Sequence, residues 1–185
     1  MFIQTEETPN PSALKFIPGR EVMPTGTADF VDLEAAQGSP LAARLFAVAG
    51  VVGVFLGADF VSVTKSDGTE WHLLKPSVLG AIMEHFMSGE PVISDDTGDE
   101  SHTPAIDEGD EEVVKQIVEL LDTRVRPAVA QDGGDIVFYG FKEGIVYLHM
   151  QGACSGCPSS SATLKMGIEN MLRHYVPEVQ EVRQV

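Results

Sequence analysis

The chain has 185 residues, enough for one domain of ordinary size or for two small ones. Hydrophobic residues make up 43% and charged residues 22%, which is typical of a soluble globular protein, and no apolar run reaches the length of a membrane span. The formal net charge of −16 at pH 7 argues against nucleic acid as a partner, because phosphate binding requires a basic patch.

The first stretch of the chain alternates strand-like and turn-like segments. Residues 2–5 and 13–17 are predicted strands. Between them, Thr8-Pro9-Asn10-Pro11 predicts a rigid turn, because two prolines fix φ and Asn tolerates turn geometry. Residues 18–38 are rich in Pro and Gly, so we expect them to be irregular.

A helix, two strands and a second helix are predicted next. Ser39-Pro40 is a helix start, with Ser as the N-cap and Pro in the first turn, and Gly50 ends this helix. Residues 51–56 and 60–65 read as the strands of a hairpin. The second helix has an apolar face, in which we expect the methionines to be core residues; the face consists of Val78, Leu79, Ile82, Met83, Phe86 and Met87.

His72 and His85 are the candidates for chemistry in this half of the chain. Neither has a cysteine or a second histidine at ligand spacing, so we expect both to be solvated or capping residues. Nothing in residues 1–93 predicts catalysis.

Residues 94–110 form the most acidic stretch of the chain. They carry seven acids and no Lys or Arg, include Gly and Pro, and show no apolar period. We expect an acidic, flexible linker that self-repulsion keeps extended. Residues 111–185 have a net charge of only −3, compared with −6 for residues 1–93, so the last part of the chain is the least opposed to pairing with its own copy.

The last part of the chain is predicted to fold as a helix, a hairpin and a helix. Asp110 can cap the first helix, and Pro127 is expected to kink or restart it near Arg126. Asp132-Gly133-Gly134-Asp135 ends that helix; positive φ accounts for both glycines, with a role beside the cysteines as the alternative. Residues 136–141 and 145–150 are the predicted hairpin strands, and residues 179–182 a last strand.

The chain has two cysteines, Cys154 and Cys157, in the stretch Gln151-Gly-Ala-Cys-Ser-Gly-Cys-Pro158. This exposed loop of small residues precedes a helix, and a helix N-terminus favours thiolate. Two buried structural cysteines and a disulfide that closes a very short loop remain possible interpretations. Dithiol redox chemistry uses the same spacing, although it is expected on a βαβ unit, which the surrounding pattern does not predict.

A metal site is the better interpretation of the two thiols. Iron–sulfur clusters and structural zinc usually take four protein ligands, and one chain supplies two cysteines. Two chains supply four. The sequence therefore predicts a metal held between two copies of the chain.

A resemblance to a known family makes this prediction more specific. Asp132-Gly-Gly-Asp135, a hairpin and then Gly152-Ala-Cys-Ser-Gly-Cys-Pro-Ser-Ser160 resemble the C-terminal domain of NifU, the Nfu-type iron–sulfur domain, over about residues 111–182. The resemblance implies that Cys154 and Cys157 of two subunits bind one 4Fe-4S cluster. It also implies an upstream cluster donor and apo-protein clients. Zinc would satisfy the same geometry.

The first half of the chain also resembles part of this family. Thr8-Pro-Asn-Pro11, Ser39-Pro-Leu-Ala-Ala-Arg-Leu-Phe46, the strand pair and Trp71 are similar to the N-terminal domain of Nfu-type proteins, over about residues 2–92. In the family, this domain is thought to recognise partners.

Together these observations predict an α+β protein of two small domains, each a short mixed or antiparallel sheet packed against helices. Residues 1–93 form the docking domain, residues 94–110 the linker and residues 111–185 the cluster domain. We expect an iron–sulfur scaffold or carrier and not an enzyme, a homodimer when the cluster is bound, with no nucleic acid or membrane as a partner. A zinc-bridged dimerisation module and a dithiol oxidoreductase are the alternatives.

The beginning of the chain bears on its compartment. It shows neither a secretory signal nor an Arg-rich transit peptide, and two cysteines in such a chain fit a reducing compartment. We expect the cytoplasm of a bacterium, or the mitochondrial matrix if a transit peptide has been removed.

Overall fold

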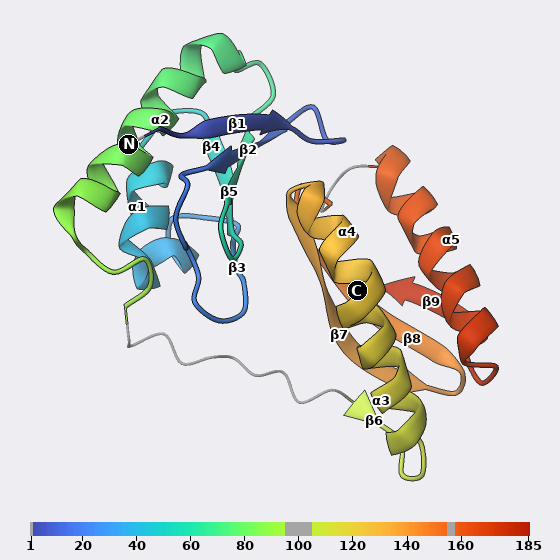
Figure 1. Cartoon of the computed structure of the whole chain (residues 1–185). Helices are drawn as coiled ribbons and strands as arrows, with labels where there is room; N and C mark the ends of the chain where they lie inside the picture. Colours follow the sequence, from blue (N-terminus) through green and yellow to red (C-terminus); the bar gives the residue numbers. More distant parts are fainter. Residues whose placement is uncertain (1, 95–104, 155–157) are drawn as a thin grey trace. The chain divides into compact units, whose positions relative to one another are not determined.

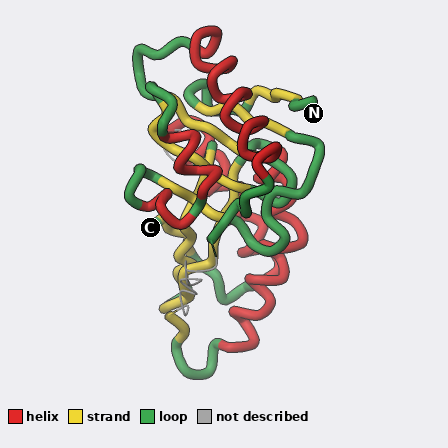
Figure 2. Tube along the Cα trace, turned by 90° about the vertical axis from the view of Figure 1, so that its left-hand side faces the viewer, coloured by secondary structure: helices red, strands yellow, loops and turns green. Residues whose placement is uncertain are grey.

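A computed structural model describes residues 2–94, 105–154 and 158–185 (Figure 1). The chain divides into two compact units, Met1–Asp99 and Glu100–Val185, called here the N-terminal and the C-terminal unit. Both combine a sheet with helices, so the predicted α+β class and the two-domain organisation are confirmed. Figure 2 shows the alternation of strands and helices along the trace.

The N-terminal unit is built on a five-stranded antiparallel sheet in the order β1-β2-β5-β4-β3. The strands are β1 (Gln4–Glu7), β2 (Ala13–Ile17), β3 (Ala28–Phe30), β4 (Val51–Leu56) and β5 (Val61–Lys65). Strand β3 was not predicted, because it is too short to show an apolar period and is held by pairing with β4. The helical elements are the 3-10 turn η1 (Ala35–Gly38), α1 (Pro40–Phe46) and α2 (Trp71–Ser88).

Local signals in the sequence place the first helix correctly. The Ser39 hydroxyl accepts the Ala42 N–H at 3.1 Å and donates to the carbonyl of Val92, so it caps α1 and also anchors the end of the unit. Helix α2 begins seven residues earlier than the predicted apolar face, at Trp71. The Trp71 indole N–H donates to the carbonyl of Pro11 at 3.1 Å, which ties the helix to the turn between β1 and β2.

The C-terminal unit has a mixed four-stranded sheet in the order β6-β7-β8-β9. Its strands are β6 (Ala105–Ile106), β7 (Gly134–Lys142), β8 (Ile145–Gly152) and β9 (Glu181–Gln184). Strands β7 and β8 form the predicted antiparallel hairpin, whereas β6 and β9 pair in parallel with β7 and β8. Strand β6 lies inside the segment predicted to be a linker; residues 95–104 of that segment lie outside the described residues.

The helices of the C-terminal unit are α3 (Glu111–Leu120), a π-helical turn η2 (Leu121–Val125), α4 (Arg126–Gln131) and α5 (Pro158–Tyr175). In Figure 1, α3 and α4 lie in front of the β7–β8 hairpin, and α5 lies beside β9. Alternate residues of β8, namely Val146, Leu148 and Met150, are buried in the core with Ile117 of α3 and Leu172 of α5. Across the described parts of both units, none of the helices is both long and apolar enough to cross a membrane.

Candidate metal centre

Cys154 lies two residues after the end of β8 and four residues before the start of α5. The sequence prediction that the thiols precede a helix agrees with this position. Cys157, with Ser155 and Gly156, lies outside the described residues.

The side chain of Cys154 is buried, not exposed as expected. Its exposed fraction is 7%, and it belongs to the hydrophobic core cluster of the C-terminal unit. The expectation was wrong because the small residues around the thiol bring it close to the sheet instead of leaving it in solvent.

Gly134 explains how Cys154 comes so close to the sheet. A Cβ on Gly134 would lie 2.7 Å from Sγ of Cys154 and 2.7 Å from the carbonyl oxygen of Gln151, closer than real Cβ atoms approach. The backbones are also joined, because the Ala153 N–H donates to the carbonyl of Gly133 at 3.1 Å. Only glycine fits at position 134 while the thiol stays in this place.

The two glycines before β7 therefore have different roles. Gly133 has a φ of +80°, as predicted for a glycine at a helix end. Gly134 does not have a positive φ; it is needed for the close approach of Cys154. The alternative interpretation, a role beside the cysteines, is correct for Gly134.

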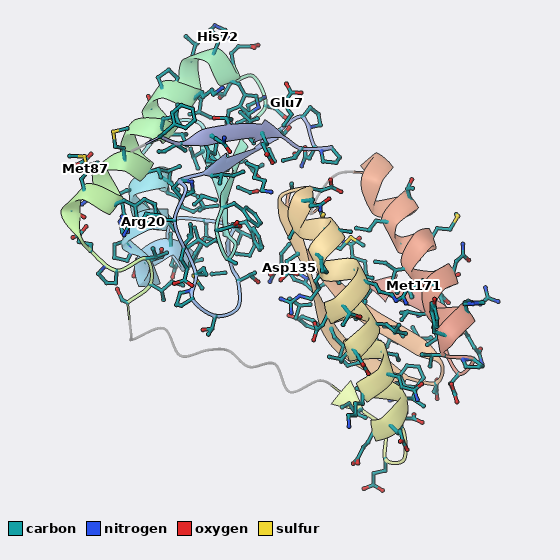
Figure 3. All side chains as sticks on the ribbon, in the orientation of Figure 1. Glu7, Arg20, His72, Met87, Asp135 and Met171 are labelled. Atoms are coloured by element: carbon teal, nitrogen blue, oxygen red, sulfur yellow. The ribbon has the colours of Figure 1, made fainter. Side chains whose placement is uncertain are left out.

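Next to Gly134, the buried carboxylate of Asp135 forms an ion pair with Arg126 of α4. Asp135 is labelled in Figure 3. Nε of Arg126 donates to Oδ1 at 2.9 Å and Nη2 donates to Oδ2 at 2.8 Å, so the guanidinium binds the carboxylate with both arms. The Asp135 side chain is 5% exposed and that of Arg126 is 38% exposed. The hydrogen bonds that Arg126 donates to Asp135, opposed by burial, raise the pKa of Arg126 above its ordinary value.

The helix that carries Arg126 is irregular at this point. Pro127 has no N–H, and a new helical segment begins at Arg126, as the sequence predicted. The structure adds that α3 passes into α4 through the π-helical turn η2 without a break. Across that turn, Nη1 of Arg126 donates to Oδ1 of Asp122 at 3.1 Å. Sequence reasoning missed the Arg126–Asp135 pair, although a carboxylate at the start of an apolar strand was a usable signal.

His85 does not have the predicted environment. It is fully buried in α2, and neither ring nitrogen has a hydrogen-bond partner among the described residues. Burial, reinforced by the charge of Arg44 and opposed by Glu90, lowers the pKa of His85 below its ordinary value. The prediction of a solvated or capping residue is wrong for His85, whereas His72 is exposed as expected.

The methionines of α2 are also placed differently from the prediction. Met83 is 37% exposed and Met87 is 77% exposed, and Figure 3 shows Met87 on the outer side of the helix. The buried stripe of α2 consists of Leu74, Val78, Ile82 and His85. Since the histidine occupies a core position, the methionines lie on the opposite face.

Within residues 2–94, 105–154 and 158–185, no group of three or more His, Cys, Asp or Glu side chains is arranged to hold a metal ion. Among the described residues, the site therefore has one thiol, that of Cys154. It contacts Gly134 and lies between strand β8 and helix α5.

Two family models match the chain in the order of its two units. "Scaffold protein Nfu/NifU N terminal" matches residues 3–89, and "NifU-like domain" matches residues 117–183.

Similar proteins match over the whole of this chain. "NifU-like protein 4, mitochondrial" of Arabidopsis thaliana is 56% identical, with 66% of that protein covered. "NFU1 iron-sulfur cluster scaffold homolog, mitochondrial" of Homo sapiens is 53% identical, with 72% covered. The chain thus spans about two thirds of the length of these relatives. Among solved structures, a NifU-like protein from Saccharomyces cerevisiae is 28% identical over 51% of this chain and 86% of its own, with a TM-score of 0.42.

Proposed function

The chain belongs to the Nfu/NifU family, and from this premise we propose that it is an iron–sulfur cluster scaffold or carrier whose cluster is cargo. The ligands are the thiolates of Cys154 and Cys157, and the cluster is of the 4Fe-4S type. The observation that carries the proposal is the position of Cys154, held on Gly134 between β8 and α5, inside the residues that the NifU-like domain matches.

The cluster is shared between two copies of the chain. A four-iron cluster usually takes four cysteine ligands, and each chain has two cysteines. Residues 111–185 carry a net charge of only −3, so this part of two copies can approach at the lowest electrostatic cost.

Delivery is the role that suits such a site. A cluster held by two copies is released when the copies separate or when a client's thiols replace those of the carrier. Because Cys154 is 7% exposed, loading and release both require its thiol to leave the contact with Gly134. No step of this cycle requires covalent catalysis, so we assign a carrier role and not an enzymatic one. The partners are an upstream cluster donor and apo-protein clients.

The N-terminal unit contributes docking and not ligands. It contains no cysteine, and we assign residues 1–93 to docking, residues 94–110 to the connection and residues 111–185 to cluster binding. A flexible connection between two sites raises the effective concentration to about millimolar when its span matches. The relatives from Arabidopsis thaliana and Homo sapiens are named as mitochondrial, which favours the mitochondrial matrix over a bacterial cytoplasm for this chain.

Anaerobic reconstitution of the full chain with iron and sulfide tests the proposal. Wild type should gain visible absorbance and acid-labile sulfide, whereas Cys154→Ser and Cys157→Ser should not hold a stable cluster. Because Cys154 is buried, Cys154→Ala is the control for a hydroxyl that the core does not satisfy. Zinc without sulfide in the purified dimer would favour the zinc-bridged module. Disulfide reductase activity of the iron-free wild type would favour the redox function.

A shortened chain tests the division of labour. The fragment should begin at residue 100, because a start at residue 106 would cut strand β6, which pairs with Gly140 and Phe141 of β7. We expect residues 100–185 to hold a cluster and to deliver it more slowly to some apo-proteins only. Equal rates for every client would remove the docking role.

A further inference from the structure

The Arg126–Asp135 pair is unusual for the C-terminal unit. Asp135 is the one charged side chain that is buried among the described residues of that unit. Burying a carboxylate costs stability unless it is paired and hydrogen-bonded, and an apolar residue would fill the same space without that cost. A buried charge at the start of β7 therefore calls for a specific role.

The pair has the geometry of a clamp. Both carboxylate oxygens of Asp135 accept from the guanidinium of Arg126, and Oδ1 also accepts the Ile136 N–H at 2.8 Å. The third arm of the guanidinium binds Asp122 at 3.1 Å. A planar guanidinium held at both oxygens fixes orientation as well as distance, which a lysine ammonium does not. The clamp joins the start of α4 to the start of β7.

The clamped strand end is the surface on which Cys154 rests. Gly134, the neighbour of Asp135, makes the close contact with Sγ of Cys154. Across the hairpin, Gly134 is the register partner of Gly152, and Asp135 is the register partner of Gln151. A shift of Asp135 thus moves both the backbone below the thiol and the strand that leads to it.

We propose that Arg126 is a positioning residue for the thiol of Cys154, acting through the carboxylate of Asp135 and the backbone of Gly134. The inference rests on the cluster-binding role proposed above and extends it to a residue that does not touch the cargo. When the clamp is intact, Gly134 holds the thiol in its buried position. When the clamp is lost, the thiol leaves this position more readily.

The rate at which iodoacetamide alkylates Cys154 measures this positioning without any cluster. The full chain is used in a Cys157→Ser background, so that Cys154 is the only thiol. Arg126→Gln and Asp135→Asn should be alkylated about 10-fold faster than the parent, because a charge-assisted hydrogen bond is lost. Arg126→Lys, which keeps the charge but loses the two-armed geometry, should be intermediate. Arg173→Gln is the control, because the Arg173 side chain is 56% exposed and its ion pair with Glu169 on α5 is long, at 3.8 Å.

Low concentrations of urea separate positioning from a merely structural role. Local opening exposes little surface, so its rate hardly changes with urea, whereas global unfolding accelerates in proportion to the surface exposed. We expect the faster alkylation of Arg126→Gln to be independent of low urea. If that variant does not fold, the same measurement on Arg126→Lys decides the question. Alkylation at the parent rate, or an acceleration that follows global unfolding in every variant, would overturn the proposal.

Cluster loss from the chain with both cysteines separates this inference from the function on which it rests. Arg126→Gln should lose its cluster about 10-fold faster than wild type, with Arg126→Lys between them. If wild type takes up no cluster while the alkylation rates differ as expected, the proposed function fails and the positioning of the thiol stands. If wild type takes up a cluster and the alkylation rates are equal, the function stands and the positioning fails.

Discussion

Each of the two units buries an ionisable side chain, and they do so in different ways. In the C-terminal unit, Asp135 receives both arms of Arg126 and a backbone N–H. In the N-terminal unit, the ring nitrogens of His85 have no hydrogen-bond partner among the described residues. The carboxylate thus has partners for both oxygens, whereas burial lowers the pKa of His85 below its ordinary value.

The buried ionisable group that has a charged partner is the one in the unit that contains the cysteines. The paired carboxylate lies next to Gly134, on which the thiol of Cys154 rests, whereas the unpaired histidine lies in the unit without a cysteine. In the C-terminal unit, a two-armed ion pair fixes the buried carboxylate. In the N-terminal unit, the buried histidine should make the stability depend on pH. The two can be followed separately, because the single tryptophan is Trp71 and all three tyrosines lie in the C-terminal unit.

Removing the partner of Asp135 should have the largest effect. Arg126→Met leaves a buried carboxylate unpaired, and we expect the free energy of unfolding of the C-terminal unit to fall by about 3 kcal/mol, the lower end for buried pairs because Arg126 is partly exposed. Urea unfolding followed by tyrosine fluorescence measures it. Arg173→Met, which removes a 56% exposed arginine from a 3.8 Å ion pair with Glu169, should change the value by less than about 1 kcal/mol. Equal losses in both variants would mean that the Arg126–Asp135 pair stabilises the unit no more than the Arg173–Glu169 pair does.

A methyl group on Gly134 should have the next largest effect. Gly134→Ala places a Cβ against Sγ of Cys154 and the carbonyl of Gln151, and overpacking of this kind typically costs about 1–3 kcal/mol. The control is Gly167→Ala in α5, where a Cβ meets nothing within 4 Å and helix propensity predicts a gain of about 0.5–1 kcal/mol. We expect the two variants to change the free energy of unfolding in urea in opposite directions. An unchanged free energy in Gly134→Ala would show that the neighbouring atoms move aside for the methyl group.

The pH dependence of the N-terminal unit should be smaller. Because the pKa of folded His85 lies below its ordinary value of 6.5, the unfolded chain binds a proton that the folded unit does not. Stability should be constant above about pH 6.5 and should fall below it by at most about 1.4 kcal/mol per pH unit until the folded pKa is reached.

Trp71 fluorescence during urea unfolding at several pH values measures this dependence. His85→Phe should remove it, and Arg44→Gln should make the loss at low pH smaller, because without the charge of Arg44 the pKa of folded His85 lies closer to its ordinary value. Glu90 acts in the opposite direction, so Glu90→Gln should not mimic Arg44→Gln. A pH profile that is unchanged in His85→Phe would contradict the assignment.

The smallest effect is expected on the outer face of α2. Met87→Ser should leave the stability of the N-terminal unit within about 0.5 kcal/mol, because the side chain is 77% exposed. Ile82→Ala on the buried face of the same helix should cost about 2–5 kcal/mol. A large loss in Met87→Ser would restore the sequence prediction that this residue belongs to the core.

The sequence predicted what local signals determine. Ser39-Pro40 places the start of α1, and alternation places β8 and its hairpin partner β7. What depends on distant contacts was missed. Strand β6 and the parallel pairing of β9 arise from tertiary packing, and the buried stripe of α2 could not be chosen from a helix with apolar residues on both faces.

The candidate site divides in the same way. The spacing of Cys154 and Cys157 and their place before a helix were visible in the sequence. The burial of Cys154, the steric need for Gly134 and the clamp of Arg126 on Asp135 are properties of the fold. The contact of Gly134 with Cys154 joins two strand ends that are 20 residues apart, so no local pattern predicts it. Arg126 and Asp135 lie nine residues apart, and the polar residue at the start of an apolar strand was the one local sign of their pairing.

The central claim is that two copies of the chain share one cluster. Native mass spectrometry of the anaerobically reconstituted full chain, with light scattering before and after reconstitution, tests it most directly. The account predicts a largely monomeric apo-protein and a dimer that carries four irons and four sulfides per two chains. A monomer that holds a complete four-iron cluster would contradict it.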